Sequence, residues 1–145
     1  MNHFNVRVYG ILISNNKLLV SDEFIKGNNI TKLPGGGLEF GEGTIDCVIR
    51  EFKEELNLDI EVVSHFYTTD FFVNSAFSIN SQVISIYYKV KAKGNLDFKT
   101  SDKLFDFEKK VEGAQSFRWI DFSKVSERDF TFVIDKRVGD MLGDN

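Results

Sequence analysis

The chain has 145 residues, 42% of them hydrophobic and 28% charged, which is typical of one soluble globular domain spanning residues 1–145. Its net charge of -4 argues against a nucleic-acid-binding surface, because affinity for polyanions depends on Lys and Arg. Cys47 is the only cysteine, which excludes an intramolecular disulfide and a cysteine-cluster zinc site.

The N-terminal segment and the hydropathy of the chain bear on its location. The first ten residues, MNHFNVRVYG, lack the basic region and apolar run of a signal peptide. No stretch of about 18 apolar residues occurs, so we expect no membrane span. We therefore expect a cytoplasmic protein without a membrane partner.

Extended segments dominate the first part of the chain. Residues 6–14 are rich in β-branched and apolar side chains, and the turn dipeptide Asn15-Asn16 separates them from the apolar run of residues 17–24. This pattern predicts two strands joined by a tight turn. Residues 30–33 form a further short extended piece, because Pro34 biases the residue before it away from helical angles.

Three glycines, Gly35, Gly36 and Gly37, follow the proline directly. Glycine adopts backbone angles closed to other residues and allows a ligand to approach the backbone closely. We therefore predict a glycine-rich turn that contributes to a binding site. A flexible surface loop is the alternative.

A helix is predicted from about Thr44 to Leu56, with Gly43 or Thr44 as its N-cap and Asp46 near the positive end of its dipole. Asn57 is expected to end it in the left-handed conformation. Apolar residues at three- and four-residue spacing predict the buried stripe. They are Ile45, Val48 or Ile49, Phe52 and Leu56.

The second half of the chain predicts strands, an irregular excursion and a closing helix. Alternation begins at Ile60 and returns over Gln82–Lys93, with a polar loop over residues 74–81. Residues 94–113 show no clean period, and residues 116–121 predict a last short strand. Helical spacing over residues 130–141 predicts the closing helix.

The predicted helix and the turn before it carry more negative charge than they can neutralise. Glu51 and Glu55 lie one turn apart, Glu54 lies beside them, and Glu42 precedes them in the turn. Arg50 reaches Glu54 at i,i+4, but one guanidinium cannot neutralise four carboxylates. A solvated helix face is one interpretation of these glutamates.

A divalent-metal site is the other interpretation. The standard phosphate-binding motifs are absent, because no Lys-Ser/Thr pair follows the glycines and the Rossmann glycine spacing is missing. Glu39 and Glu42 would also repel a bare phosphate. Carboxylates suit Mg²⁺ or Mn²⁺, hard cations that take oxygen ligands and bridge to substrate phosphates.

The spacing over residues 36–58 resembles the Nudix box of the Nudix hydrolases, the MutT-related family. The matching residues are Gly36, Glu42, Arg50, Glu51, Glu54 and Glu55. Two positions depart from the family pattern: Phe52 stands where an aliphatic residue is usual, and Asn57 replaces a glycine. Neither departure removes a ligand, and Asn tolerates the backbone conformation that glycine would take.

The resemblance implies both a fold and a chemistry. The fold is of the α/β class, a Nudix-type α/β/α sandwich around a mixed β-sheet. The activity is hydrolysis of the pyrophosphate linkage in a nucleoside diphosphate joined to another moiety, with Mg²⁺ or Mn²⁺ as cofactor. The partner is thus a small nucleotide-type substrate, and a homodimer remains an open arrangement.

The resemblance also assigns roles to residues of the box. Glu51, Glu54 and Glu55 are implied as metal ligands, together with the Gly35 carbonyl. Arg50 is implied to orient these glutamates through ion pairs, so the expected catalytic set is Glu54, Glu55 and Arg50.

Relatives often carry one more carboxylate shortly before a late strand that contains Trp. Glu112, upstream of Trp119, occupies such a place and is assigned as a further metal ligand. A solvated loop glutamate is the alternative.

The substrate is less defined than the chemistry. Phe66, Tyr67 and Phe72 are candidates for stacking on a base or sugar, with core packing as the alternative. Residues 74–76 lack the Pro or Tyr that marks relatives cleaving ADP-ribose or dinucleoside polyphosphates, so a nucleoside triphosphate or a nucleotide sugar remains open. The competing class is a catalytically silent Nudix-fold binding module, which usually shows eroded box glutamates.

Overall fold

The computed structural model describes residues 1–144, which form two compact units. One unit contains residues 1–12 and 34–98, and the other contains residues 13–33 and the chain from residue 99 onward. Each unit is therefore built from two separate stretches of chain. The single domain expected over residues 1–145 stays a prediction.

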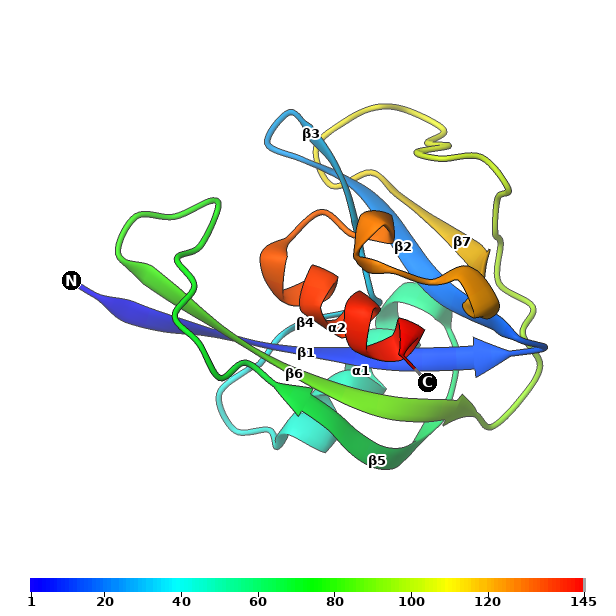
Figure 1. Ribbon diagram of the computed structural model, residues 1–145, viewed down its shortest axis with the longest axis horizontal. Helices are drawn as coiled ribbons and strands as arrows, with labels where there is room; N and C mark the ends of the chain where they lie inside the picture. The colour runs from blue at the N-terminus through cyan, green and yellow to red at the C-terminus, as the bar shows by residue number, and fades with distance from the viewer. Residues whose placement is uncertain (145) are drawn as a thin grey trace. The chain divides into compact units, whose positions relative to one another are not determined.

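The first unit is built on a mixed sheet in the order β4-β1-β6-β5 (Figure 1). Strand β1 pairs antiparallel with β4 and parallel with β6, and β6 pairs antiparallel with β5. The strands are β1 (His3–Ser14), β4 (Gly35–Gly37), β5 (Ile60–Thr68) and β6 (Ser81–Ala92). The predicted α/β class and mixed sheet are confirmed.

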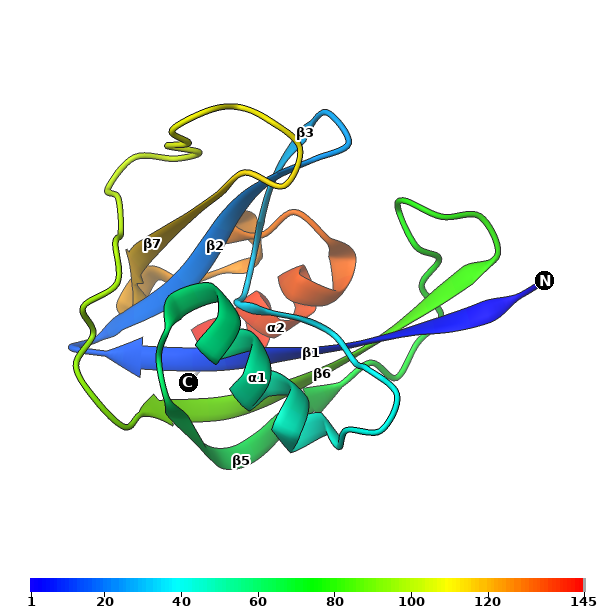
Figure 2. The ribbon, with the colours of Figure 1, turned by 180° about the vertical axis from the view of Figure 1, so that it is seen from behind.

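Helix α1 (Thr44–Leu56) has the bounds that the sequence predicts. Gly43 is its N-cap, and the Gly43 N–H donates to the Asp46 carboxylate at 3.2 Å. Asn57 ends the helix at φ 50°, in the predicted left-handed conformation. Helix α1 crosses the sheet of its own unit, in front of β1 in Figure 2.

The predicted apolar stripe of α1 is partly wrong. The exposed fractions of Ile45 and Ile49 are 46% and 36%. Phe52 and Leu56 are buried as predicted, and of the two alternatives Val48 and Ile49 it is Val48 that is buried. The error is thus Ile45, whose place in the stripe is taken by Cys47. Cys47 takes the inner position because the side of the helix that carries it faces the glycine strand, where its thiol donates to the Gly37 carbonyl at 3.5 Å.

Gly10 allows the helix to lie close to the sheet. A Cβ atom added at Gly10 would lie 2.5 Å from Phe52 Cε1 and 3.3 Å from Val48 Cγ2. Because both of these side chains are fully buried, neither has free space into which it can move. The approach of α1 to β1 therefore requires glycine at this position.

The glycines of residues 35–37 form the short strand β4 and not the predicted turn. Its pairing with β1 is framed by two backbone hydrogen bonds of 2.9 Å, Gly10 N–H to the Pro34 carbonyl and Leu38 N–H to the Val6 carbonyl. Glycine suits this strand because a Cβ at Gly35 would lie 2.1 Å from the Val8 carbonyl oxygen.

The second unit is an antiparallel sheet with β2 at its centre, flanked by β3 and β7. Asn15 and Asn16, at φ 51° and 61°, form the predicted tight turn between β1 and β2. Two 3₁₀ turns and a helix follow the sheet. The elements are β2 (Lys17–Ile25), β3 (Asn28–Lys32), β7 (Gln115–Asp121), η1 (Phe122–Lys124), η2 (Glu127–Asp129) and α2 (Val133–Gly143).

A buried ion pair holds the irregular excursion onto this second sheet. Asp22 is fully buried and accepts two hydrogen bonds from Arg118, at 2.9 and 3.0 Å. The same carboxylate accepts from the Thr31 hydroxyl at 2.7 Å and from the Phe105 N–H at 3.1 Å. Residues 94–113, irregular as predicted, are thus anchored near their middle.

No helix within residues 1–144 is long and apolar enough to cross a membrane.

We predict that Gly10→Ala destabilises the protein, because the added methyl overlaps the Phe52 ring. The free energy of unfolding should fall by roughly 1–3 kcal/mol, the usual cost of overpacking a core. Gly94→Ala is the matched control, since a Cβ there meets no atom of residues 1–144 within 4 Å. Urea denaturation followed by circular dichroism measures both variants, and equal stabilities would contradict the predicted overlap.

Candidate active site

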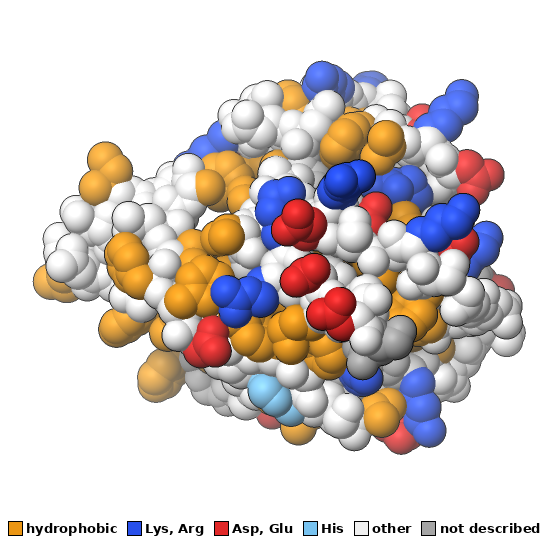
Figure 3. All heavy atoms as spheres, in the orientation of Figure 1, with side chains coloured by type: hydrophobic (Ala, Val, Ile, Leu, Met, Phe, Trp, Pro, Cys, Tyr) orange, Lys and Arg blue, Asp and Glu red, His pale blue; other side chains and the backbone are white. Residues whose placement is uncertain are grey.

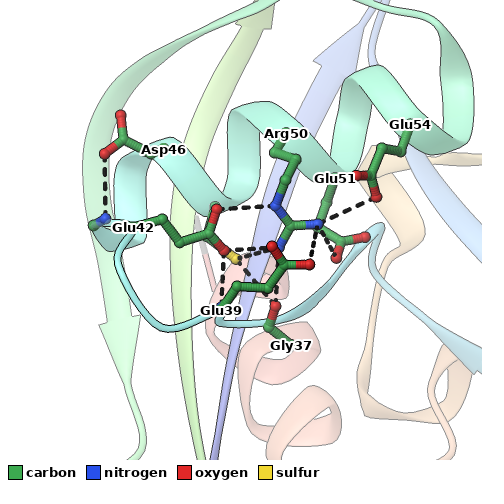
Figure 4. A network of polar contacts seen from close by, with 9 residues as sticks. Gly37, Glu39, Glu42, Asp46, Arg50, Glu51 and Glu54 are labelled. Atoms are coloured by element: carbon green, nitrogen blue, oxygen red, sulfur yellow. Dashed lines mark hydrogen bonds and ion pairs between the residues drawn. The ribbon is translucent and has the colours of Figure 1, made fainter.

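Arg50 of α1 is the centre of a cluster of carboxylates (Figure 4). Its Nε and Nη2 donate to the two oxygens of Glu42, at 2.9 and 2.7 Å. Its Nη1 donates to Glu51 at 3.1 Å and to Glu54 at 3.2 Å, and lies 3.6 Å from Glu39. One guanidinium thus faces four carboxylates, which leaves the cluster strongly negative.

The guanidinium also ties the helix to the glycine strand. Arg50 Nη2 donates to the Gly37 carbonyl at 3.1 Å, and the Glu39 N–H donates to Glu42 at 2.9 Å. These contacts hold the loop between β4 and α1 against the first turns of the helix. Because a guanidinium offers five donors in a fixed plane, a lysine could not make the same set of contacts.

The ion pairs strongly favour the charged forms of these groups. Hydrogen bonds from Arg50, and then from the Glu39 N–H, lower the pKa of Glu42 from 4.5 to about 2. The Glu42 carboxylate and the other acidic neighbours raise the pKa of Arg50. Both groups therefore remain ionised at neutral pH.

Cys47 lies beside this cluster as a buried thiol. Burial, followed by its contact with Glu42, raises the pKa of its thiol from 9.0 to about 12. The thiol therefore stays protonated at neutral pH. Its role is to donate to the Gly37 carbonyl from the buried side of α1.

Gly36 brings the β4 backbone against Glu51. A Cβ at Gly36 would lie 2.6 Å from Glu51 Oε1, so any side chain there would displace the carboxylate. The Gly35 carbonyl belongs to the peptide group that leads into Gly36. The Glu51 carboxylate and the glycine backbone are therefore direct neighbours.

The model of the NUDIX domain family matches residues 2–138 of this chain. The chain belongs to this family. Over 55 residues it is 38% identical to an RNA pyrophosphohydrolase of Ruthia magnifica subsp. Calyptogena magnifica. That match covers 38% of this chain and 31% of the relative, which is less than a third of the relative's length.

Solved structures match over most of the chain. A MutT NUDIX hydrolase of Burkholderia pseudomallei has a TM-score of 0.68 at 13% identity, covering 95% of this chain and 96% of that one. A NUDIX hydrolase of Nitrosomonas europaea has a TM-score of 0.64 at 22% identity, covering 94% and 68%. This likeness in fold confirms the predicted Nudix-type α/β/α sandwich around a mixed β-sheet.

Arg50 joins Glu42, Glu51 and Glu54 of this Nudix domain, and Gly36 lies against Glu51, whereas the metal-binding and catalytic roles of the box residues stay predictions. Among residues 1–144, no three Asp, Glu, His or Cys side chains converge in an arrangement ready for a metal ion. The physical reason lies in Arg50, whose Nη1 draws the carboxylates of both Glu51 and Glu54. Glu54 remains 59% exposed, whereas Glu55 is half-buried.

Glu112 lies in the second unit of the Nudix domain. Its carboxylate is exposed and accepts a hydrogen bond of 2.7 Å from the Lys26 N–H at the turn between β2 and β3. This contact fixes the place of the side chain on its own unit. Its assignment as a metal ligand stays a prediction.

The three aromatic candidates have different surroundings. Tyr67 is buried, with its ring 6.4 Å from that of Tyr87, and its hydroxyl donates to Asp70 at 2.6 Å. Phe66 is half-buried, with Lys89 Nζ 5.2 Å from its ring centre. Only Phe72 is largely exposed, at 66%. Of the three, Phe72 is therefore the one that offers an open ring surface to a ligand.

The sequence indicated that Glu39 and Glu42 repel a bare phosphate, but it indicated neither the ion pair of Glu39 with Arg50 nor the contact of Arg50 with Cys47. Glu39 precedes Glu42 by three residues, a spacing at which a turn brings both carboxylates to one cation. Cys47 precedes Arg50 by three residues on the helix, so the two share a face. Both spacings are visible in the sequence, but the path of the loop decides whether Glu39 and Cys47 contact Arg50.

We predict that the Glu42 carboxyl has a pKa of about 2, which an NMR titration of its side chain measures. Because this folded-state pKa is depressed, its stabilising contribution is present above pH 4.5 and is lost as the pH falls toward 2. Arg50→Ala should return the Glu42 pKa toward 4.5. Lys53→Ala on the same helix is the control, since Lys53 pairs with Asp59 instead. An ordinary Glu42 pKa in the wild-type protein would show that Arg50 does not hold it.

Proposed function

We propose that this Nudix domain is a divalent-metal-dependent hydrolase. It cleaves the pyrophosphate linkage of a nucleoside diphosphate joined to another moiety, as in a nucleoside triphosphate or a nucleotide sugar. The observation that carries the proposal is the Arg50 cluster, in which four carboxylates meet one cation beside the glycine backbone of β4. The similarity to an RNA pyrophosphohydrolase supports the class of bond.

The donor set suits Mg²⁺ or Mn²⁺. Glu51, Glu54 and Glu55 supply only carboxylate oxygens, the ligands that hard cations take. Gly36 has no side chain between the Glu51 carboxylate and the β4 backbone, so the Gly35 carbonyl is a further oxygen in that neighbourhood. We assign the cation to these residues, with Glu112 as an additional ligand. Bound there, it would neutralise the substrate's phosphates and acidify water.

In this proposal, Arg50 positions the site and a glutamate of the box transfers the proton. Arg50 fixes Glu42 and the loop after β4, and so keeps the box glutamates in place. Water adds to one phosphorus of the pyrophosphate, and the bond from that phosphorus to the bridging oxygen breaks. A carboxylate takes the proton that the water loses. We assign this proton transfer to Glu54 or Glu55, with a carboxylate typically contributing about 10²–10⁴-fold in rate.

The substrate is proposed to be a small nucleotide. The net charge of -4 disfavours a long polyanion. A cytoplasmic location and a homodimer remain sequence-based expectations. Neither affects the chemistry at the box.

The deciding experiment is a hydrolysis panel with Mg²⁺ or Mn²⁺. It contains nucleoside triphosphates, nucleotide sugars, ADP-ribose and dinucleoside polyphosphates. Because one relative is named an RNA pyrophosphohydrolase, RNA with a 5′-triphosphate is included. Release of phosphate, pyrophosphate or a nucleoside monophosphate supports the proposal. Metal binding without turnover on any member would favour the silent binding module.

We predict that Glu55→Gln abolishes most of the metal-dependent turnover, since the amide can neither hold a cation strongly nor accept the proton. On the best panel substrate, kcat should fall roughly 10²–10⁴-fold with an unchanged melting temperature. Glu61→Gln on β5 is the matched control, because Glu61 pairs on the surface with Lys91. Wild-type turnover in Glu55→Gln would contradict the assignment.

We predict a smaller effect for Glu112→Gln, which keeps an oxygen acceptor for the Lys26 N–H but removes the charge. The Mg²⁺ concentration needed for half-maximal activity should rise roughly tenfold, as is usual when a supporting ligand is lost. Glu108→Gln in the same excursion is the control, since Glu108 pairs with the exposed Lys99. Identical Mg²⁺ dependence in both variants would return Glu112 to a purely structural role.

A further inference from the structure

The first unit contains a hollow that is separate from the Arg50 cluster. It has a volume of about 800 Å³ and lies between the start of β1 and the segment of residues 72–82, which includes the loop before β6. In Figure 1 this is the end of the unit that carries the N-terminus, and Figure 3 shows hydrophobic side chains spread over it. The volume falls within the range of small-molecule sites, about 300–1,000 Å³.

The lining of this hollow is aromatic and amide-rich and almost uncharged. Phe4 and Phe72 line it with exposed fractions of 66% each, and Asn74 and Gln82 add carboxamides. Of its lining residues, all within residues 1–144, none is Lys, Arg, Asp or Glu. Such a lining does not suit a phosphate. It suits a neutral ring with apolar faces and a hydrogen-bonding edge.

The strand register places Phe4, Gln82 and Asn74 in one row across the sheet. Phe4 of β1 pairs with Gln82 of β6, and Gln82 forms a bridge with Asn74. Residues paired across neighbouring strands point to the same face of a sheet. The row therefore presents one aromatic ring beside two carboxamides.

This row lies on the same face of the sheet as α1. The pairing of β1 with β6 runs without a register shift from His3 to Leu12. Phe4, Val8 and Gly10 therefore share a face, and Gly10 is the residue against which α1 packs. Val8 pairs with Gly36 and lies four positions along β1 from Phe4, roughly 13 Å. The hollow and the Glu51 carboxylate thus share one face of the first unit.

We propose that this hollow binds the nucleobase of a nucleotide. The inference rests on the proposed function and names the part of the substrate that is recognised away from the phosphates. Phe4 supplies a stacking surface that accepts any base, and Phe72 is a second open ring. Gln82 and Asn74 offer both donors and acceptors to the edge of the base, as carboxamides do in recognition of adenine. A second copy of the chain covering the same apolar residues is the competing occupant.

Calorimetry on the metal-free chain of 145 residues tests the proposal. The probes are AMP, GMP, CMP and UMP, with ribose 5-phosphate as the probe that lacks a base. Two variants alter the row: Phe4→Ala removes the ring, and Gln82→Leu removes the amide at similar size. Val63→Ala is the matched control, since Val63 is a 59% exposed hydrophobic residue of β5 that does not line the hollow. Circular dichroism verifies that each variant is folded.

We expect at least one nucleoside monophosphate to bind the wild-type chain at least tenfold more tightly than ribose 5-phosphate. Its Kd should rise about tenfold in Phe4→Ala, as for loss of one stacking surface, and also in Gln82→Leu, but not in Val63→Ala. Ribose 5-phosphate binding as tightly as the monophosphates would overturn the proposal. So would equal Kd values in all variants, or no binding by the wild-type chain. A dimer that Phe4→Ala dissociates without a change in nucleotide affinity would assign the hollow to a second copy.

The test does not depend on turnover. The probes contain no pyrophosphate linkage and the protein contains no metal, so a failed hydrolysis panel and a failed binding experiment are separate results.

Discussion

The site depends on one guanidinium held among like charges. Without Arg50, the carboxylates of Glu42, Glu51 and Glu54 would repel one another and the loop after β4 would lose its attachment to α1. With Arg50 in place, the repulsion is reduced but not removed, because one positive charge faces several carboxylates. The same ion pairs therefore stabilise the loop and leave a surplus of negative charge on the helix face, the charge that the proposed cation would neutralise. A neutral helix face would not combine these two properties.

Local sequence signals specified the helix well and its buried side less well. The cap residues Gly43 and Asn57 act within one turn of the helix, so its bounds could be predicted to the residue. Ile45 has the right spacing for burial, yet it is exposed and Cys47 is buried, because the neighbour of α1 decides which side is inner. That neighbour is the sheet beside Gly10, a tertiary contact that helical periodicity does not encode.

Contacts between distant segments explain the remaining differences. The glycines of β4 look like a turn in isolation, but their pairing with β1 makes them a strand, since strand formation depends on context. The spacing of the box residues predicted which carboxylates gather on α1. It did not predict the Gly37 carbonyl as an acceptor for Arg50, because that contact depends on the path of the loop. The bond between Glu112 and Lys26 spans 86 positions, beyond the reach of any local pattern.

The division of each unit into two stretches of chain has a consequence for folding. Asp22 meets Arg118 across 96 positions, and its partners Thr31 and Phe105 come from two further parts of the chain. The second unit therefore cannot close until most of the chain has been synthesised, although its first strands emerge early. Until Arg118 is available, the Asp22 carboxylate has no cationic partner and cannot be buried. Bringing the two residues together also carries the entropic cost of closing the long loop between them. We therefore expect assembly to be slow and cooperative, with the second unit completed last.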